Sequence, residues 1–97
     1  MFAVAGTIKK IEFKNKSKEY FNLILTKKKG DSEYPLSFYV FNNELVKDFK
    51  DEKFIEGDNV EITFYIKGRE NNGYVTNNLY ADRVAVLKRN KSSKVSD

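Results

Sequence analysis

The side chains of this chain that could do chemistry are aromatic rings, lysines and carboxylates, because the 97 residues include neither histidine nor cysteine. Their absence removes the commonest general base, the commonest zinc ligands and any disulfide. Two acidic groups remain as candidates, Asp31 with Glu33 and Asp51 with Glu52. Neither has the spacing of a calcium-binding loop, so we interpret both as solvated loop acids. We therefore expect a binding protein without a cofactor or metal, and not an enzyme.

The aromatic rings and the lysines are suited to binding. Surface rings can stack on nucleobases, and lysines displace counterions from phosphates. Residues 1–30 hold eight Lys and two Glu, a net charge of +6, and residues 31–66 hold three Lys and nine acids, a net −6. Residues 67–97 hold seven basic and three acidic residues, a net +4. If the two basic segments meet in the fold they form a positive pole; the alternative is an ordinary solvated surface.

The elements that must position these side chains are predicted from the alternation of apolar and polar residues, which has the period of half-buried strands. Changes of phase near Lys9–Lys10 and Asp82–Arg83 predict bulges, so the first and last strands should be long and curved. Residues 42–49 begin with a capping Asn and carry apolar residues on one side, which predicts a short helix. The strands are predicted over residues 2–13, 19–27, 34–41, 59–67 and 74–87.

The hairpin of residues 59–87 is the most informative pair of strands. Its first strand alternates apolar with polar or aromatic residues, so one face should be core and the other should offer Tyr65 and Lys67 to solvent. The positions that we expect to point into the core are Val60, Ile62, Phe64 and Ile66. A curved sheet with a basic, aromatic outer face is well suited to binding a single-stranded nucleic acid.

The order of three strands, a short helix and two strands indicates an all-β, five-stranded OB-fold barrel with the helix between strands 3 and 4. Residues 1–87 are expected to form this single domain, and residues 88–97 a disordered basic tail. The N-terminus has no signal-like segment, and no window is long and apolar enough to cross a membrane. We expect a soluble protein of the cytoplasm.

Five segments in order along the chain carry a likeness to a known family. They are residues 4–8, 38–43, 44–49, 56–62 and 69–77. Together they resemble the single-stranded DNA-binding protein family, and more narrowly its short phage and bacterial members. The resemblance covers nearly all of residues 1–87. It implies an OB-fold that binds single-stranded DNA without sequence preference and protects it in replication or recombination, in the host cytoplasm if phage-encoded.

The resemblance and the residues together predict the binding site. By resemblance, Phe41 stacks on a base, and Lys67, Arg69 and Tyr74 bind the single-stranded DNA. From the residues themselves, exposed rings and basic loops extend this set. The further predicted site residues are Lys9, Lys10, Lys14, Lys16, Tyr34 and Tyr39.

Each of these assignments has an alternative. Phe41 could instead pack against the helix, Tyr39 could pair with a neighbouring strand, and the lysines could serve only solubility. For Tyr20, Tyr65 and Tyr80 we favour cross-strand pairs or subunit contacts over base stacking.

The function also has alternatives. It could be a primosome-like OB-fold adaptor that contacts proteins and binds nucleic acid weakly. RNA is an alternative ligand, because no motif reports on a 2′-hydroxyl contact. We expect a homo-oligomer, a dimer or a tetramer, because Ile24 and several tyrosines lie on outer faces of the strands.

Overall fold

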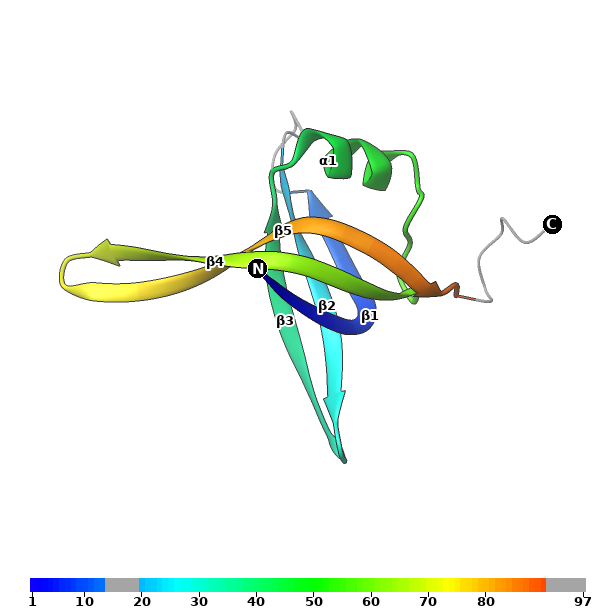
Figure 1. The fold of residues 1–97 in the computed structure, drawn as a ribbon, viewed down its shortest axis with the longest axis horizontal. Helices are drawn as coiled ribbons and strands as arrows, with labels where there is room; N and C mark the ends of the chain where they lie inside the picture. Colours follow the sequence, from blue (N-terminus) through cyan, green and yellow to red (C-terminus); the bar gives the residue numbers. More distant parts are fainter. Residues whose placement is uncertain (14–19, 91–97) are drawn as a thin grey trace.

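The structure, a computed structural model, describes residues 1–13 and 20–90. Its elements run in the predicted order, three strands, one helix and two strands (Figure 1). They are β1 (Phe2–Phe13), β2 (Phe21–Lys29), β3 (Ser32–Val40), α1 (Asn43–Lys50), β4 (Asn59–Asn71) and β5 (Tyr74–Lys88). The predicted all-β fold with one short helix between the third and fourth strands is therefore confirmed.

The five strands close into a barrel in the order β1-β2-β3-β5-β4. All neighbouring pairs are antiparallel except β3 and β5, which meet in parallel at Tyr39 and Tyr80. Strand β1 closes the barrel because residues 2–7 pair with β4 and residues 7–13 pair with β2. This order, with a helix between β3 and β4, is the OB-fold.

Within the described residues, three bulges bend the strands of the barrel, and two of them lie where the sequence predicts them. The pairing of β1 with β2 shifts between Ile8 and Lys10, and the pairing of β4 with β5 shifts between Thr63 and Phe64, opposite Asp82. The third, which the sequence does not predict, shifts the pairing of β4 with β5 between Asn59 and Val60. Each bulge adds one residue to one strand, which bends the strand and increases its twist. The changes of phase in the sequence therefore report real bends.

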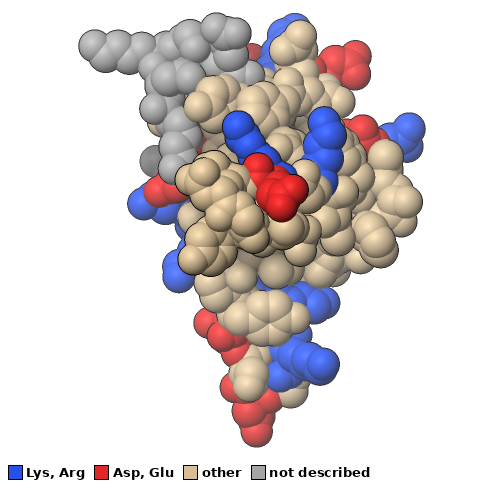
Figure 2. Space-filling view, turned by 90° about the vertical axis from the view of Figure 1, so that its left-hand side faces the viewer, with Lys and Arg blue, Asp and Glu red and all other residues tan. Residues whose placement is uncertain are grey.

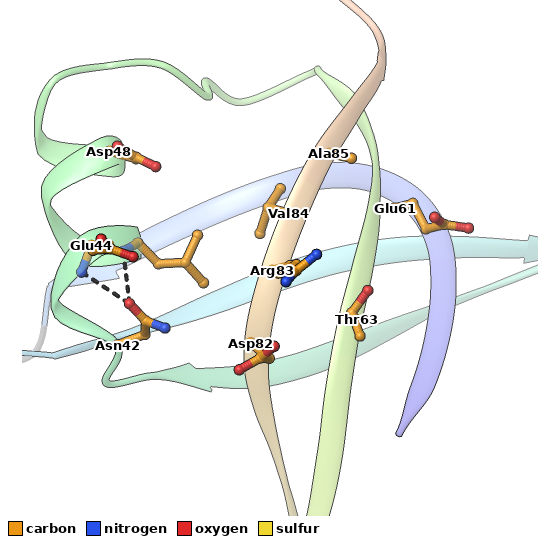
Figure 3. A pocket seen from close by; sticks show the side chains of 10 residues that line it. Asn42, Glu44, Asp48, Glu61, Thr63, Asp82, Arg83, Val84 and Ala85 are labelled. Carbon is orange, nitrogen blue, oxygen red and sulfur yellow. Dashed lines mark hydrogen bonds between the residues drawn. The ribbon is translucent and has the colours of Figure 1, made fainter.

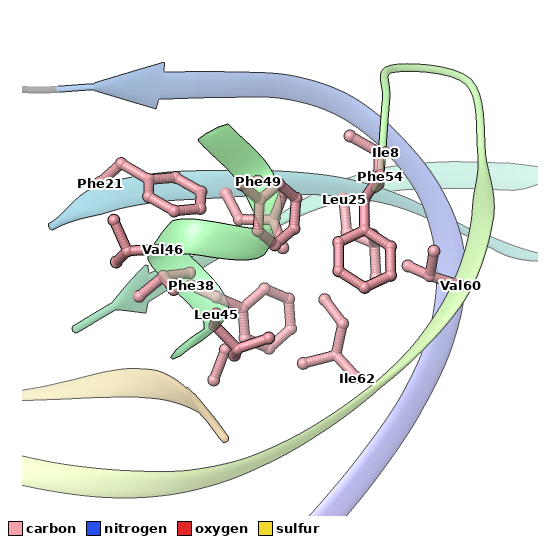
Figure 4. Close-up of a cluster of buried hydrophobic side chains, with 13 residues drawn as sticks. Ile8, Phe21, Leu25, Phe38, Leu45, Val46, Phe49, Phe54, Val60 and Ile62 are labelled. Atoms are coloured by element: carbon pink, nitrogen blue, oxygen red, sulfur yellow. The ribbon is translucent and has the colours of Figure 1, made fainter. Parts of the chain in front are cut away.

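The core is built from the inward side chains of the strands and from one side of α1 (Figure 4). Asn42 caps the helix, since its Oδ1 accepts hydrogen bonds from the backbone N–H groups of Glu44 at 2.9 Å and Leu45 at 3.3 Å. The ring of Phe49 then lies 4.9 Å from Phe21, so α1 closes one end of the barrel. The buried apolar residues are Ile8, Phe21, Leu23, Leu25, Phe38, Val40, Leu45, Val46, Phe49, Phe54, Val60, Ile62 and Ala81.

The far part of the β4–β5 hairpin leaves the barrel, and here one prediction is wrong. Ile66, expected in the core, is 45% exposed. The pairing of β1 with β4 ends at Phe64, and β3 meets β5 at Tyr80, so residues 66–79 project as a two-stranded arm (Figure 1). The arm turns at Asn72 and Gly73, whose positive φ angles of 53° and 83° suit a tight two-residue hairpin turn.

The end of β5 is tied to the loop before β4 by a buried carboxylate. Asp58 is fully buried, and it accepts hydrogen bonds from the backbone N–H groups of Ile55 at 3.1 Å and Asn90 at 2.8 Å. The guanidinium of Arg89 lies 3.5 Å from the same carboxylate. Residues 88–90, which the sequence assigns to the tail, are thus part of the fold, and residues 91–97 lie outside the described residues.

At Gly6 strand β1 passes close to β2, and this yields a stability prediction. A Cβ at this position would lie 2.7 Å from the carbonyl oxygen of Thr26 and 2.9 Å from a methyl group of Leu25. We expect Gly6→Ala to lower the free energy of unfolding by about 1–3 kcal/mol, the usual cost of overpacking. The measurement is chemical denaturation. Gly68→Ala is the control, because its Cβ would make an ordinary contact at 3.5 Å; equal stability of both variants and the wild type would contradict the prediction.

Candidate nucleic-acid interface

Three tyrosines lie side by side on the outer surface of the barrel. Tyr39 on β3 pairs with Tyr80 on β5, and Tyr80 pairs in turn with Tyr65 on β4. The ring centroids of Tyr39 and Tyr80 are 5.5 Å apart, and those of Tyr65 and Tyr80 are 5.4 Å apart, with interplanar angles of 30° and 16°. The alternation of each strand turns its tyrosine outward, and the closure of the barrel brings the three strands together.

Two further rings extend this row. Phe41, one residue past the end of β3, lies 5.8 Å from Tyr80 and 4.8 Å from Tyr20, which stacks on it at 18°. We call the five residues Tyr20, Tyr39, Phe41, Tyr65 and Tyr80 the aromatic patch. Phe41 is 49% exposed and Tyr65 40% exposed, whereas the other three rings are half-buried. The free ring surface is therefore concentrated on Phe41 and Tyr65. The alternative for Phe41, a ring buried by packing against the helix, is wrong, since half of its surface is exposed and its ring contacts are with tyrosines.

The arm carries cations on the same face as the aromatic patch. Lys67 and Arg69 follow Tyr65 at alternate positions of β4, so their side chains share its face. The ammonium of Lys67 lies over the ring of Tyr80, 6.0 Å from its centroid, within the range of a cation–π contact. Tyr74 is also on this face, since it pairs with Asn71 at the tip of the arm. It lies about 20 Å from Tyr65 along the strand at ~3.3 Å per residue, so it does not join the patch.

The bulge of β1 places Lys9 and Lys10 on the outer surface. Both are exposed, and the Nζ of Lys10 lies 3.0 Å from a carboxylate oxygen of Glu12. Glu12 pairs with Asn22, which pairs in turn with Tyr39, so this part of β1 continues the outer face that carries the aromatic patch.

Of the remaining predicted residues, Tyr34 is placed away from the patch. It pairs with Lys27 near the tip of the β2–β3 hairpin and lies on the opposite face of β3 from Tyr39. Lys14 and Lys16 lie outside the described residues.

A groove beside α1 lies next to the aromatic patch on one side (Figure 3). Thr63, which lines it, stands two residues before Tyr65 on β4, so the groove adjoins the patch. Four carboxylates and one guanidinium line the groove and make it unfavourable for phosphates. The charged residues are Glu44, Asp48, Glu61, Asp82 and Arg83. Among residues 1–13 and 20–90, no cluster of acidic side chains is arranged to hold a metal ion.

Charge is sparse on the side of the molecule from which the arm projects. Figure 2 shows this side, and most of its surface is uncharged. At its lower end, formed by the β2–β3 hairpin, Lys and Arg gather along one edge and Asp and Glu along the other. In this view the charges therefore do not divide the molecule into one positive and one negative pole.

The structure brings three further rings, those of Tyr20, Tyr65 and Tyr80, together with the predicted residues Tyr39 and Phe41. The sequence favours cross-strand or subunit contacts for them, and Tyr65 and Tyr80 do form a cross-strand pair. The same pairing joins them to Phe41 and Tyr39. The signal that could have revealed this is the outward parity that Tyr39 and Tyr65 share on their strands, combined with the contact between β3 and β5 that an OB-fold implies.

No protein-family model matches this sequence, and no curated protein is found similar to it. Solved structures with the same fold are found. The mitochondrial single-stranded DNA binding protein Rim1 from S. cerevisiae is 18% identical with a TM-score of 0.66, over 90% of this chain and 93% of Rim1. The dimeric N-terminal domain of PriB from Thermoanaerobacter tencongensis is 18% identical with a TM-score of 0.65, over 91% and 96% of the two chains.

A small single-stranded DNA-binding protein from Streptomyces coelicolor is 14% identical with a TM-score of 0.54, over 95% of each chain. The likeness to the fold of single-stranded DNA-binding proteins that the sequence indicates is therefore confirmed. Among the described residues, no helix has the length and apolar character needed to span a membrane.

Proposed function

We propose that this protein binds single-stranded DNA without sequence preference, through the aromatic patch and the cationic face of the arm. The observation that carries the proposal is the continuous set of five rings on the outside of the barrel, with Lys67 over one of them. Proteins that bind single strands without sequence preference combine such rings with a positively charged path for the backbone.

The exposed rings contact bases, and the cations contact phosphates. Phe41 and Tyr65 carry the largest free ring surface, so they stack on bases, while Tyr39 and Tyr80 support them from the side. Stacking tolerates any base because every base has a π face. Lys67 and Arg69 on the arm neutralise phosphates, which makes the affinity depend on salt.

The path of the bound DNA strand follows from the charges around the aromatic patch. The acidic groove beside α1 repels phosphates, so the bound DNA strand does not leave the aromatic patch on that side. It leaves instead towards the arm on one side and along the outer face of β1, β2 and β3 on the other.

We further propose that the protein acts as a homo-oligomer in the cytoplasm and protects single strands during replication or recombination. The dimeric state of the PriB domain supports self-association of this fold. RNA remains a second ligand to be compared with DNA, because stacking alone does not discriminate the two sugars.

A protein-contacting adaptor is the second candidate function, and one observation favours it. The face of the arm opposite to Lys67 and Arg69 exposes Ile66 by 45% and Val75 by 65%. Exposed apolar residues on one face of a strand pair are suited to contact with another protein.

A titration separates the two candidates. Fluorescent oligothymidine is titrated as a single strand and, annealed, as a duplex, each at a low and a high salt concentration. The proposed function predicts preferential binding of the single strand that weakens as salt rises. The absence of single-strand binding at low salt would rule it out and favour the adaptor.

A further inference from the structure

A shallow hollow lies on the outer face of the barrel, where the bulged strand β1 meets the β2–β3 hairpin. Side chains of three strands line it, two hydroxyls, two ammonium groups and one carboxylate: Thr7, Lys9, Thr26, Lys28 and Glu33. Among the hollows of the described surface, it differs from the groove beside α1 in carrying more cations than acids.

The hydroxyl groups of the hollow face each other across two strands. Thr7 on β1 pairs with Thr26 on β2. The Oγ1 of Thr7 accepts a hydrogen bond from the Nδ2 of Asn59 at 3.4 Å, so its own proton is available to donate. Both hydroxyls can therefore donate hydrogen bonds to an anion in the hollow.

The two lysines are not committed to carboxylates. Lys10, the neighbour of Lys9, is held by Glu12 at 3.0 Å. Within residues 1–13 and 20–90, neither Lys9 nor Lys28 forms an ion pair, although Lys28 stands opposite Glu33 on the hairpin. The hollow thus offers two unpaired ammonium groups beside two hydroxyl donors.

The hollow lies on the same outer face as the aromatic patch. Thr26 pairs with Pro35, which stands four residues before Tyr39 on β3. At ~3.3 Å per residue, the hollow is about 13 Å from Tyr39 along the strand. Both Thr26 and Tyr39 occupy outward positions, since the inward positions of β2 and β3 hold Leu25 and Phe38.

We propose that this hollow holds a phosphodiester group of the single strand whose bases stack on the aromatic patch; the inference rests on the proposed function. Two ammonium groups and one carboxylate, that of Glu33, give the hollow one net positive charge, which matches the single negative charge of a phosphodiester. The dianion of a free phosphate is less well matched. The DNA strand then runs from Phe41 and Tyr39 towards the β1 bulge.

The test measures how the affinity for a fluorescent oligothymidine 15-mer changes with salt. For single strands, the logarithm of the binding constant falls with the logarithm of salt concentration by about 0.7 per phosphate contact. The double variant Lys9→Ala, Lys28→Ala is expected to lose about 0.7 from this slope. The control is Lys47→Ala, Lys50→Ala, which removes the same charge from the surface of α1 and should leave the slope nearly unchanged.

Glu33→Gln tests the opposite change of charge in the hollow. It removes the only carboxylate that lines the hollow, so the affinity for the 15-mer should rise. A slope in the Lys9, Lys28 variant equal to that of the control variant would overturn the inference. The proposed function would survive that result if Phe41→Ala still weakened binding, so the two failures are distinguishable.

Inorganic phosphate alone tests the source of the anion. We expect it to shift the backbone amide resonances of Lys9 and Thr26 only at concentrations far above those of the oligonucleotide that do so. Tighter binding of inorganic phosphate than of the 15-mer at these residues would overturn the assignment to a phosphodiester.

Discussion

Replacing Phe41 and Tyr65 together by alanine is expected to weaken the binding of single-stranded oligothymidine more than any other change in the aromatic patch. These are its two most exposed rings, at 49% and 40%, and no contact between them is formed directly. Each stacked base contributes about 1–3 kcal/mol, or roughly 5- to 150-fold in affinity, so each single variant should show a loss of this size. Because both rings touch Tyr80, the double variant should lose somewhat less than the sum.

Tyr34→Ala is the matched control for this experiment. Tyr34 is as exposed as Tyr65, at 40%, but it lies on the opposite face of β3 from Tyr39. Its removal should leave the affinity within a factor of two or so, an effect below ~0.5 kcal/mol. Fluorescence anisotropy measures the affinity of each variant, and thermal unfolding verifies that each variant is folded. A loss with Tyr34→Ala equal to that with Tyr65→Ala would place the binding surface elsewhere.

Asp58→Ala is expected to destabilise the fold more than any other single substitution of an acidic residue in the described part of the chain. The carboxylate is fully buried and accepts hydrogen bonds from the backbone N–H groups of Ile55 and Asn90. Its removal deprives both partly buried donors of this acceptor, and a hydrogen bond lost to a charged, buried acceptor costs about 1–3 kcal/mol. The free energy of unfolding should therefore fall by about 2–5 kcal/mol, a large part of the stability of a small domain.

The control for Asp58 is a partly exposed acid in an ion pair at the surface. Asp48→Ala removes the partner of Lys53, whose Nζ lies 3.1 Å from the Asp48 carboxylate at the protein surface. Exposed pairs contribute about 0–1 kcal/mol, so this variant should unfold at nearly the wild-type denaturant concentration. If denaturation of Asp58→Ala gave a midpoint close to that of Asp48→Ala, the role assigned to the buried carboxylate would be refuted.

Much of the fold could be predicted from the sequence because alternation reports directly on which face a residue occupies. The bulges at Lys9 and Asp82 follow from changes of phase, and both occur in the structure. Alternation does not report whether another element covers the inward face. Ile66 has the parity of the core residue Ile62, yet it is exposed because β1 ends before it and no other described element covers the arm.

The site could be predicted only in part, because its residues meet through closure of the barrel. Tyr39 and Phe41 were expected from their place at the end of β3, and Lys67 from the arm. The contact of Tyr39 with Tyr80 joins residues 41 positions apart in a parallel pairing of β3 with β5. No local pattern reports such a pairing, so the sequence indicates only cross-strand pairs or subunit contacts for Tyr65 and Tyr80.

Tyr34 lies away from the aromatic patch, although it is an exposed aromatic residue on the same strand as Tyr39. Residue type and expected exposure made it a candidate. Five positions separate the two, an odd number, so the pleat of the strand turns their side chains to opposite faces. Exposure and residue type therefore do not suffice to place a ring in the aromatic patch, and the parity of its position along the strand decides.

The central claim is that single-stranded DNA binds on the aromatic patch, and NMR spectroscopy of the side-chain rings tests it most directly. The protein with labelled Tyr and Phe rings is titrated with single-stranded oligothymidine. Stacked bases shift the resonances of ring protons beneath them, so Phe41, Tyr65 and Tyr80 should show the largest shifts and Tyr34 almost none. Saturation with oligothymidine that leaves the rings of the patch unshifted would contradict the claim.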